Sequence, residues 1–179
     1  NNNHNFYPRL ILKDEYNAFV TGSNKIYINT GLMKRASSIS EIQGVIAHEI
    51  GHIVLNHHSS RLINRTTNSN YATIAAIAGV ALSMSNKLNG DAAAGLIIGS
   101  NDLATKSYLQ FTRIQEQQAD KFALDIMKKA KISYDGLENL LIRLSEEEFL
   151  NKSMTSKFYR SHPYSKNRLN QLQNYKKET

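Results

Sequence analysis

Cysteine is absent from the 179 residues of this sequence. Its absence excludes disulfide bonds, thiolate catalysis and zinc sites that are built on cysteine. It fits a reducing compartment as well as an oxidising one, so it gives no localisation. A run of about 18 apolar residues, which a membrane-spanning helix requires, is also absent, and no signal peptide is recognisable. Because the chain begins abruptly at NNNHNFYP, without Met, we expect a domain excised from a longer protein.

The composition is that of an ordinary globular protein, with 41% hydrophobic and 21% charged residues. At this length we expect one domain over residues 1–179. The net charge of +7 would suit nucleic acid, anionic lipid or an acidic protein as a partner. The basic residues are scattered, however, and aromatic residues do not alternate with them. The charge therefore indicates a solvated surface and no nucleic-acid partner.

A β-hairpin and a long helix are predicted in the first third of the chain. Residues 16–20 and 25–29 are rich in β-branched and aromatic residues and flank the turn sequence TGSN, which predicts two paired strands. Ser40 is followed three residues later by Gln43, which is a capping-box pattern. The stretch EIQGVIAHEIGHIVLNHH then has apolar residues at helical spacing, so we expect a mostly buried helix.

The rest of the sequence is predicted to be helical. Segment 71–100 has two apolar runs of small residues on either side of NKLNGD, and we expect a helical hairpin; the alternative is a lid or a peripheral contact with a membrane. Further helices are expected over 111–130, after SYDG through residue 150, and as a short helix from Arg168. No repeat of fixed period is found. The expected fold is α+β, mostly helical, with a small antiparallel sheet beside the HEIGH helix.

The stretch HEIGH places His48 and His52 four residues apart in the predicted helix. Both imidazoles then lie on one helix face, about 6 Å apart along the axis, so both can reach one cation. Glu49 can address a water molecule at that cation, as in the HExxH motif of zinc peptidases. The flanking residues are apolar, and His and Glu without a metal would be costly there. A pair of hydrogen-bonded core histidines is the alternative.

Two other parts of the sequence contain further residues that could bind a metal or support its ligands. A catalytic zinc ion needs a third protein ligand, and RIQEQQAD offers Glu116, with Asp120 one helical turn later. Asp120 would accept a hydrogen bond from the outer N–H of a ligand histidine. An acidic pair at this spacing is otherwise a common surface feature. His57 and His58 follow HEIGH, and we expect them to be exposed or to interact with the helix end.

Four motifs occur in an order and at a spacing that resemble a known family. NAF, HEIGH, RIQEQQAD and SHPYSKNR are similar to the motifs of the gluzincin metallopeptidases that include the CAAX prenyl protease and the heat-shock membrane protease. The resemblance is closest to the soluble periplasmic branch with the barrel-assembly-enhancing protease. It extends from about Asn17 to Arg168. The transmembrane helices of the prenyl protease have no counterpart here, so prenylated substrates are not expected.

The resemblance implies roles for residues in all four motifs. It implies one Zn²⁺ per chain, bound by His48, His52 and Glu116, with Glu49 as general base and Asp120 hydrogen-bonded to a ligand.

The resemblance also implies roles for residues near the two ends of the chain. His162, with Arg168 beside it, would stabilise the oxyanion, or His162 would occupy the open zinc position as in self-inhibited members. Asn17 and Ala18 would hydrogen-bond an extended peptide substrate along a sheet edge. For Asn17 the alternative is an ordinary residue at the end of a strand, and for His162 a residue of a surface loop.

The function implied by the resemblance is a zinc endopeptidase in which Glu49 activates the attacking water. Its substrates would be unfolded or misassembled proteins in the periplasm or cell envelope of a Gram-negative bacterium. The main alternative is a latched or non-catalytic zinc domain that binds clients like a chaperone, which the apolar segment 71–100 would suit. A purely structural zinc site with four protein ligands is a third reading, against which the placement of Glu49 argues.

Overall fold

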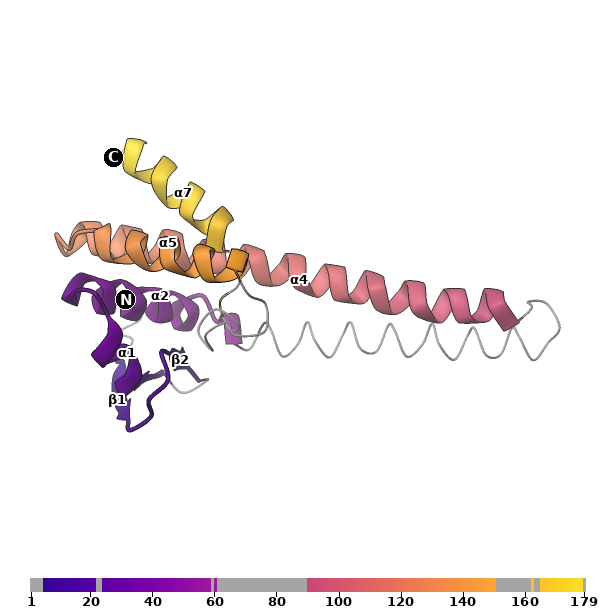
Figure 1. Ribbon diagram of the computed structural model, residues 1–179, viewed down its shortest axis with the longest axis horizontal. Helices are drawn as coiled ribbons and strands as arrows, with labels where there is room; N and C mark the ends of the chain where they lie inside the picture. The colour runs from indigo at the N-terminus through magenta and orange to yellow at the C-terminus, as the bar shows by residue number, and fades with distance from the viewer. Residues whose placement is uncertain are drawn as a thin grey trace. The chain divides into compact units, whose positions relative to one another are not determined.

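The structure is a computed structural model, and it describes residues 5–21, 24–58, 60, 90–150, 162 and 165–178 (Figure 1). The chain divides into two compact units. The first combines residues 1–58 with 113–179, and the second is formed by residues 59–112. Of the second unit the structure describes Ser60 and the helical residues 90–112.

The sheet of the first unit has three strands in the order β1-β3-β2. Strands β2 (Ala18–Val20) and β3 (Lys25–Asn29) pair antiparallel, which confirms the predicted hairpin. Strand β1 (Tyr7–Ile11) was not predicted, and it pairs parallel to β3. The sheet is therefore mixed, whereas a small antiparallel sheet was expected. Most of β1 is exposed, so it lacks the buried alternating pattern by which strands are recognised. Pro8 is tolerated there because β1 is an edge strand.

The helix that carries HEIGH is α2 (Ile39–Val54), which follows the short α1 (Thr30–Arg35). The prediction of the cap was wrong by two residues. Ser38, with extended backbone, is the N-cap, and its hydroxyl accepts a hydrogen bond from the Glu41 N–H. Ser40 already lies inside the helix. The sequence SISE contains the same capping-box spacing as SEIQ, so spacing alone does not distinguish the two serines.

A buried charged network anchors the start of α2. The Glu41 carboxylate is fully buried and accepts hydrogen bonds from the Tyr16 hydroxyl and from the Arg143 guanidinium. It also accepts from the Ser37 backbone N–H at 2.8 Å and from the Ser37 hydroxyl at 2.5 Å. The Arg143 guanidinium lies 4.6 Å from the centre of the Tyr16 ring. The network therefore connects Tyr16, which precedes Asn17, with the N-terminus of α2 and with the later helix that contains Arg143.

Replacement of Glu41 by glutamine is expected to destabilise the fold mainly at neutral pH. Burial acts to raise the pKa of Glu41, but hydrogen bonds from Ser37, Tyr16 and Arg143 outweigh it and lower the pKa. A lowered pKa gives stability above the unfolded-state value of about 4.5, and this stability is lost as the pH falls through the folded-state pKa. Urea unfolding of both proteins at pH 7 and below pH 4 measures the difference in free energy of unfolding, which should shrink in acid. An equal difference at both pH values would contradict the prediction.

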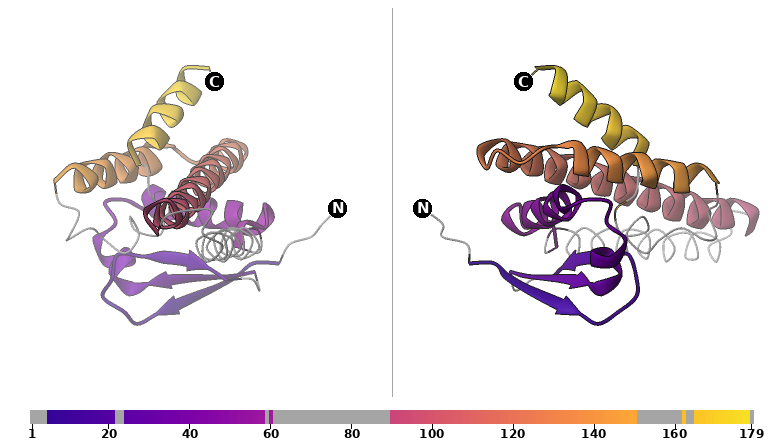
Figure 2. Two further views of the ribbon diagram at one scale, coloured as in Figure 1. Left: turned by 90° about the vertical axis from the view of Figure 1, so that its right-hand side faces the viewer. Right: turned by 60° about the vertical axis from the view of Figure 1, so that its left-hand side comes forward.

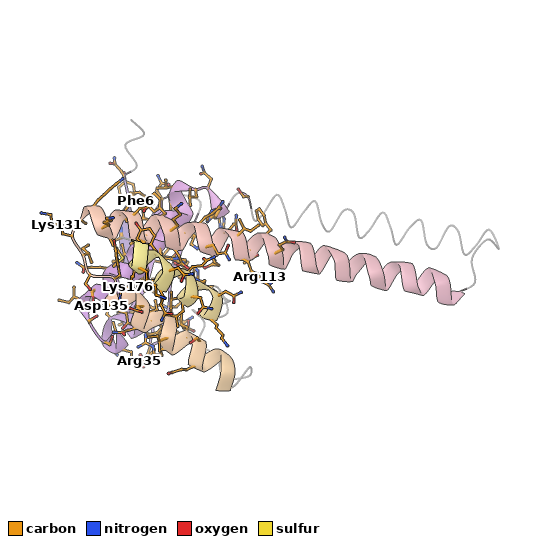
Figure 3. All side chains as sticks on the ribbon, turned by 90° about the horizontal axis from the view of Figure 1, so that it is seen from above. Phe6, Arg35, Arg113, Lys131, Asp135 and Lys176 are labelled. Atoms are coloured by element: carbon orange, nitrogen blue, oxygen red, sulfur yellow. The ribbon has the colours of Figure 1, made fainter. Side chains whose placement is uncertain are left out.

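Three helices of the first unit stack one after another on the sheet. Helix α2 lies over one face of the sheet, α5 (Asp135–Leu150) packs on α2, and α7 (Ser165–Glu178) packs on α5 (Figure 2). The shared core is apolar, and its fully buried members include Ile26, Val45 and Leu141. Gly44 of α2 allows close packing on α5, because a Cβ atom there would lie 3.0 Å from the Leu137 Cβ. At the surface, Lys176 of α7 forms an ion pair with Asp135 at the start of α5 (Figure 3).

The remaining helix, α4 (Gly90–Lys129), is longer than predicted. The prediction of a helix over 111–130 is confirmed, and Ala119, Ala123 and Met127 lie on its buried side. The second apolar run of segment 71–100 forms the first turns of this helix, and residues 71–89 lie outside the described residues. The last helix begins at Ser165, three residues earlier than expected, and is not short. None of the helices in the described ranges is long and apolar enough to cross a membrane.

Candidate metal centre

The site forms where α2 and α4 approach each other closely. His48 and His52 lie on the same face of α2, as the i, i+4 spacing predicts. Gly51, between them, is needed for the close approach, because a Cβ atom there would lie 3.0 Å from the Ala119 carbonyl oxygen of α4. This contact brings Glu116, one turn before Ala119, next to both histidines.

Four side chains place one donor atom each around a single point. These are His48, His52, Glu116 and His162, which are all buried and whose ligand atoms lie within 4.8 Å of one another. His48 Nε2 lies 3.0 Å from His52 Nε2, 3.2 Å from His162 Nδ1 and 3.2 Å from Glu116 Oε2. The carboxylate of Glu116 lies 3.4 Å from His52 Nε2 and 3.1 Å from His162 Nδ1.

These distances fit a tetrahedral zinc site. Ligand atoms at 2.0–2.1 Å from a zinc ion form a tetrahedron with edges of about 3.3 Å. The five distances given above lie between 3.0 and 3.4 Å, with Glu116 contributing both carboxylate oxygens to them. Imidazole and carboxylate are also ligands that zinc accepts. Because so many lone pairs face one another, hydrogen bonds alone cannot satisfy them, and a cation would.

The outer nitrogen of His48 has a carboxylate partner. His48 Nδ1 lies 2.8 Å from Asp120 Oδ1, so Nδ1–H donates and the lone pair of Nε2 points to the centre. Arg168 holds Asp120 in turn by two hydrogen bonds, of 2.6 Å from Nε and 2.8 Å from Nη2. Arg168 is 1% exposed, and its Nη1 donates to the His162 carbonyl oxygen at 3.0 Å and lies 3.3 Å from Glu116.

The charges of the site favour bound positive charge. Burial would raise the pKa of Glu116, but the rings of His162 and His52 hold this pKa well below its usual range. Burial lowers the pKa of His52 to about 4. For His162, Glu116 and Glu49 outweigh the effect of burial and raise the pKa to about 9. Without a metal, the centre would therefore hold a proton on His162 at neutral pH, and a metal cation can take over the role of that charge.

Glu49 lies beside the four donors and is 1% exposed. Its Oε1 atom lies 3.2 Å from His162 Nε2, an ion pair when His162 is protonated, and accepts no other hydrogen bond among the described residues. Burial would raise the pKa of Glu49, but His162 outweighs this effect and lowers the pKa, so Glu49 is a carboxylate at neutral pH. A buried carboxylate that pairs with a histidine of the centre is suited to take a proton from a water or substrate group once that histidine moves away.

His57 is buried, which the sequence did not predict. It is 3% exposed, and its Nδ1 lies 2.9 Å from Nδ1 of His52. The expectation of exposure is wrong for His57 and right for His58. The reason is that the chain turns back immediately after α2, which no helical pattern reveals. The only sequence signal is Asn56, a residue type that tolerates the left-handed conformation, and its φ is 54°.

Asn17 and Ala18 lie at the start of β2, which packs against α2. Both are buried, and Oδ1 of Asn17 has no hydrogen-bond partner in the described part of the chain. The Asn17 carbonyl accepts from the Asn29 N–H at 3.1 Å, so this carbonyl faces β3 and not the open edge of the sheet.

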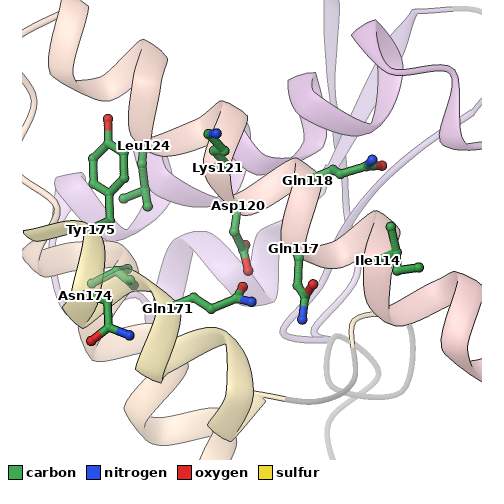
Figure 4. A pocket seen from close by; sticks show the side chains of 10 residues that line it. Ile114, Gln117, Gln118, Asp120, Lys121, Leu124, Gln171, Asn174 and Tyr175 are labelled. Carbon is green, nitrogen blue, oxygen red and sulfur yellow. The ribbon is translucent and has the colours of Figure 1, made fainter. Parts of the chain in front are cut away.

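A pocket of about 360 Å³ is lined by residues of α4 and α7 (Figure 4). Amide side chains such as Gln117, Gln171 and Asn174 line much of it, and Asp120 contributes to its wall. The pocket contains none of the four donor residues.

Comparison with known proteins identifies related chains. Residues 3–176 match peptidase family M48. The chain is 29% identical over 166 residues to the metalloprotease YcaL of Escherichia coli K12, which covers 89% of this chain and 58% of YcaL. It is 27% identical over 171 residues to the metalloprotease LoiP of the same organism, covering 93% of this chain and 62% of LoiP.

A third relative is the beta-barrel assembly-enhancing protease of Escherichia coli O157:H7. It is 24% identical over 170 residues, which covers 94% of this chain and 34% of that protein. The chain thus spans between about a third and three fifths of the length of these relatives. The family match covers nearly the whole chain, as the four ordered motifs predict, and the mostly helical fold with its small sheet is consistent with it. The chain therefore belongs to peptidase family M48.

Proposed function

We propose that this chain is a zinc-dependent endopeptidase whose site is latched in the structure by His162. The observation that carries the proposal is the set of four buried donors at tetrahedral distances, with the carboxylate of Glu49 beside them. His48, His52 and Glu116 would bind one Zn²⁺. Four protein ligands would leave no open position, and a catalytic zinc site keeps one open.

The proposed chemistry divides between the metal and the side chains. When bound, Zn²⁺ supplies Lewis acidity that polarises the scissile carbonyl and acidifies water. Glu49, whose Oε1 faces His162 in the structure, takes the proton of the attacking water and returns it to the leaving amine. Of the two roles that the resemblance implies for His162, we propose the occupation of the open zinc position, and stabilisation of the oxyanion by His162 stays a prediction.

We propose a positioning role for Arg168. Its donors already bind Asp120 and the His162 carbonyl oxygen, and it lies against Glu116. A direct contact of Arg168 with the oxyanion stays a prediction. The role that the contacts support is to hold Asp120, which orients His48.

The sheet edge at β2 is the proposed binding site for an extended peptide. Hydrogen bonds join Asn17 to Asn29 and Thr21 to Lys25, so the backbone groups of Ala18, in the alternate position, point away from β3 toward the edge. Ala18 is fully buried in this state, so a peptide could pair with it only after the edge is uncovered. Asn17 Oδ1, which is buried without a partner, would accept a hydrogen bond from the same peptide.

The substrates and the compartment are proposed from the relatives. One of them is named for enhancing beta-barrel assembly, which supports unfolded or misassembled envelope proteins of a Gram-negative bacterium as substrates and the periplasm or cell envelope as location. Two further expectations stay predictions. One is that residues 1–179 form a single zinc peptidase domain, and the other is that residues 71–100 make a peripheral contact with a membrane. The second candidate is a client-binding module that does not cleave, which the four-donor centre also supports.

Replacement of His162 by alanine is expected to increase proteolysis by at least about tenfold, because it opens the fourth position for water. The measurement is cleavage of casein by the wild-type and His162→Ala proteins, with zinc content by elemental analysis. Both proteins should contain one equivalent of zinc, and a chelator should abolish cleavage.

His58→Ala, an exposed histidine, is the matched control and should behave as the wild type. A His162→Ala protein that retains zinc and shows no cleavage would favour the client-binding module. Wild-type protein that binds no zinc would overturn the zinc site itself.

A further inference from the structure

His57 lies behind the metal centre, on the outer side of His52. Its Nδ1 is 2.9 Å from His52 Nδ1, and the two ring planes meet at 72°. On its other side, His57 Nε2 lies 3.2 Å from Oε1 of Gln118 on α4. The carbonyl oxygen of His57 accepts a hydrogen bond of 3.3 Å from the side chain of Gln115, which is also buried.

The turn after α2 places His57 at this point. Leu55 caps the helix with its N–H bonded to the Gly51 carbonyl, and Asn56 adopts the left-handed conformation. A left-handed residue after the cap reverses the direction of the chain. The next side chain, His57, therefore returns to the helix face that carries His52 instead of continuing the spiral.

The contacts of His57 select one proton arrangement. The amide Oε1 of Gln118 can only accept, so His57 Nε2 carries the proton and His57 Nδ1 has a lone pair. The proton between the two Nδ1 atoms then belongs to His52, which donates it to His57. A neutral imidazole has one N–H, so the remaining nitrogen of His52, Nε2, presents its lone pair to the other donors.

We infer that His57 and Gln118 form a relay of hydrogen bonds that fixes His52 in the tautomer required for metal binding. This inference rests on the proposed zinc site and adds a positioning pair that the HExxH motif does not contain. The two histidines of HEIGH are thus oriented differently. His48 has a carboxylate behind it, whereas His52 has a neutral ring whose own proton is placed by an amide.

Loss of the relay is expected to weaken zinc binding about tenfold to a hundredfold, which is the usual effect of removing such an outer partner. The variants are His57→Leu, which removes the acceptor, and Gln118→Leu, which removes the group that orients it. Gln118 is exposed, so its variant should fold even where His57→Leu does not. His57→Gln can restore an acceptor for His52, and His58→Leu is the matched control at the exposed neighbour.

Two measurements test the relay without relying on proteolysis. Competition with a chromophoric chelator gives the Kd for zinc, and long-range ¹H–¹⁵N NMR of the zinc-free protein at neutral pH reports which nitrogen of His52 carries the proton. We expect Nδ1–H in the wild type and His58→Leu. In His57→Leu and Gln118→Leu we expect the His52 proton to shift toward Nε2 and zinc binding to weaken. In His57→Gln we expect both the tautomer of His52 and the Kd for zinc to recover in part.

A wild-type His52 with the proton on Nε2 would overturn the inference, as would Kd values for His57→Leu and Gln118→Leu within twofold of wild type. Failure of the proposed function gives a different result. If the wild type binds no zinc, the NMR tautomer of His52 still tests the relay. If it binds zinc but does not cleave, both measurements remain valid.

Discussion

Replacement of Glu49 by glutamine is expected to lower the rate of peptide-bond cleavage by about a hundredfold to ten-thousandfold, which is the range that general bases contribute. The amide cannot take a proton, but it has nearly the same size and keeps an oxygen in place of Oε1. Glu49 is not one of the four donors, so the zinc content should be unchanged. The site should therefore remain intact while the chemical step is lost.

This effect should be measured in the His162→Ala background as well as in the wild type, because a latched protein has little activity to lose. Single-turnover cleavage of casein and elemental analysis give the rate and the zinc content. Glu146→Gln makes the same change at an exposed position of α5 and should have no effect. Undiminished cleavage by Glu49→Gln in the His162→Ala background would disprove the role of Glu49 as the base.

Replacement of Arg168 by methionine is expected to cost about 3 to 5 kcal/mol of unfolding free energy, which is the usual effect of leaving one charge of a buried pair without its partner. Arg168 is 1% exposed, and Asp120 accepts two hydrogen bonds from it. Arg168 is the main group that holds the pKa of Asp120 at about 2 against the effect of burial, so its loss would raise this pKa and leave Asp120 buried without its main charged partner. His48 would lose its fixed partner, and zinc binding should weaken as well.

The control for this prediction is another arginine–aspartate pair. Arg35 forms an ion pair of 2.9 Å with Asp14, but about half of its side chain is exposed. Exposed ion pairs contribute at most about 1 kcal/mol, so Arg35→Met should change the stability little. Urea unfolding of the zinc-free proteins compares the two variants. Equal losses in both would mean that burial does not determine the strength of the Arg168–Asp120 pair.

The local parts of the site could be predicted because helix geometry is local. Spacing of four residues places His48 and His52 on one face wherever the helix lies, and the position of Glu49 follows from the same geometry. The hairpin of β2 and β3 was predictable for a similar reason, since a short turn sequence joins two β-branched runs. The sequence offered Glu116 as a third ligand, but its role and that of His162 were supported only by the resemblance, because no local rule relates residues 68 and 114 positions after His48 to that first ligand.

Other features were decided by packing between distant segments. The parallel pairing of β1 joins two segments that a hairpin rule does not connect, and the exposed side chains of β1 carry no pattern. The network of Glu41, Tyr16 and Arg143 joins residues up to 127 positions apart. A serine at either of two positions fitted the cap of α2, and the structure selected Ser38.

The sequence by itself determined that one helix presents two histidines and a glutamate to a common point, because a period of 3.6 residues fixes their direction. Only the tertiary structure decided which side chains support the two histidines from their outer sides. His57 looked like a histidine beyond the helix end, and the left-handed turn at Asn56 buried it against His52. The resemblance implied that Arg168 helps to stabilise the oxyanion, and the packing of α7 placed its guanidinium on Asp120. Such contacts depend on how separate elements meet, which side-chain spacing within one element does not encode.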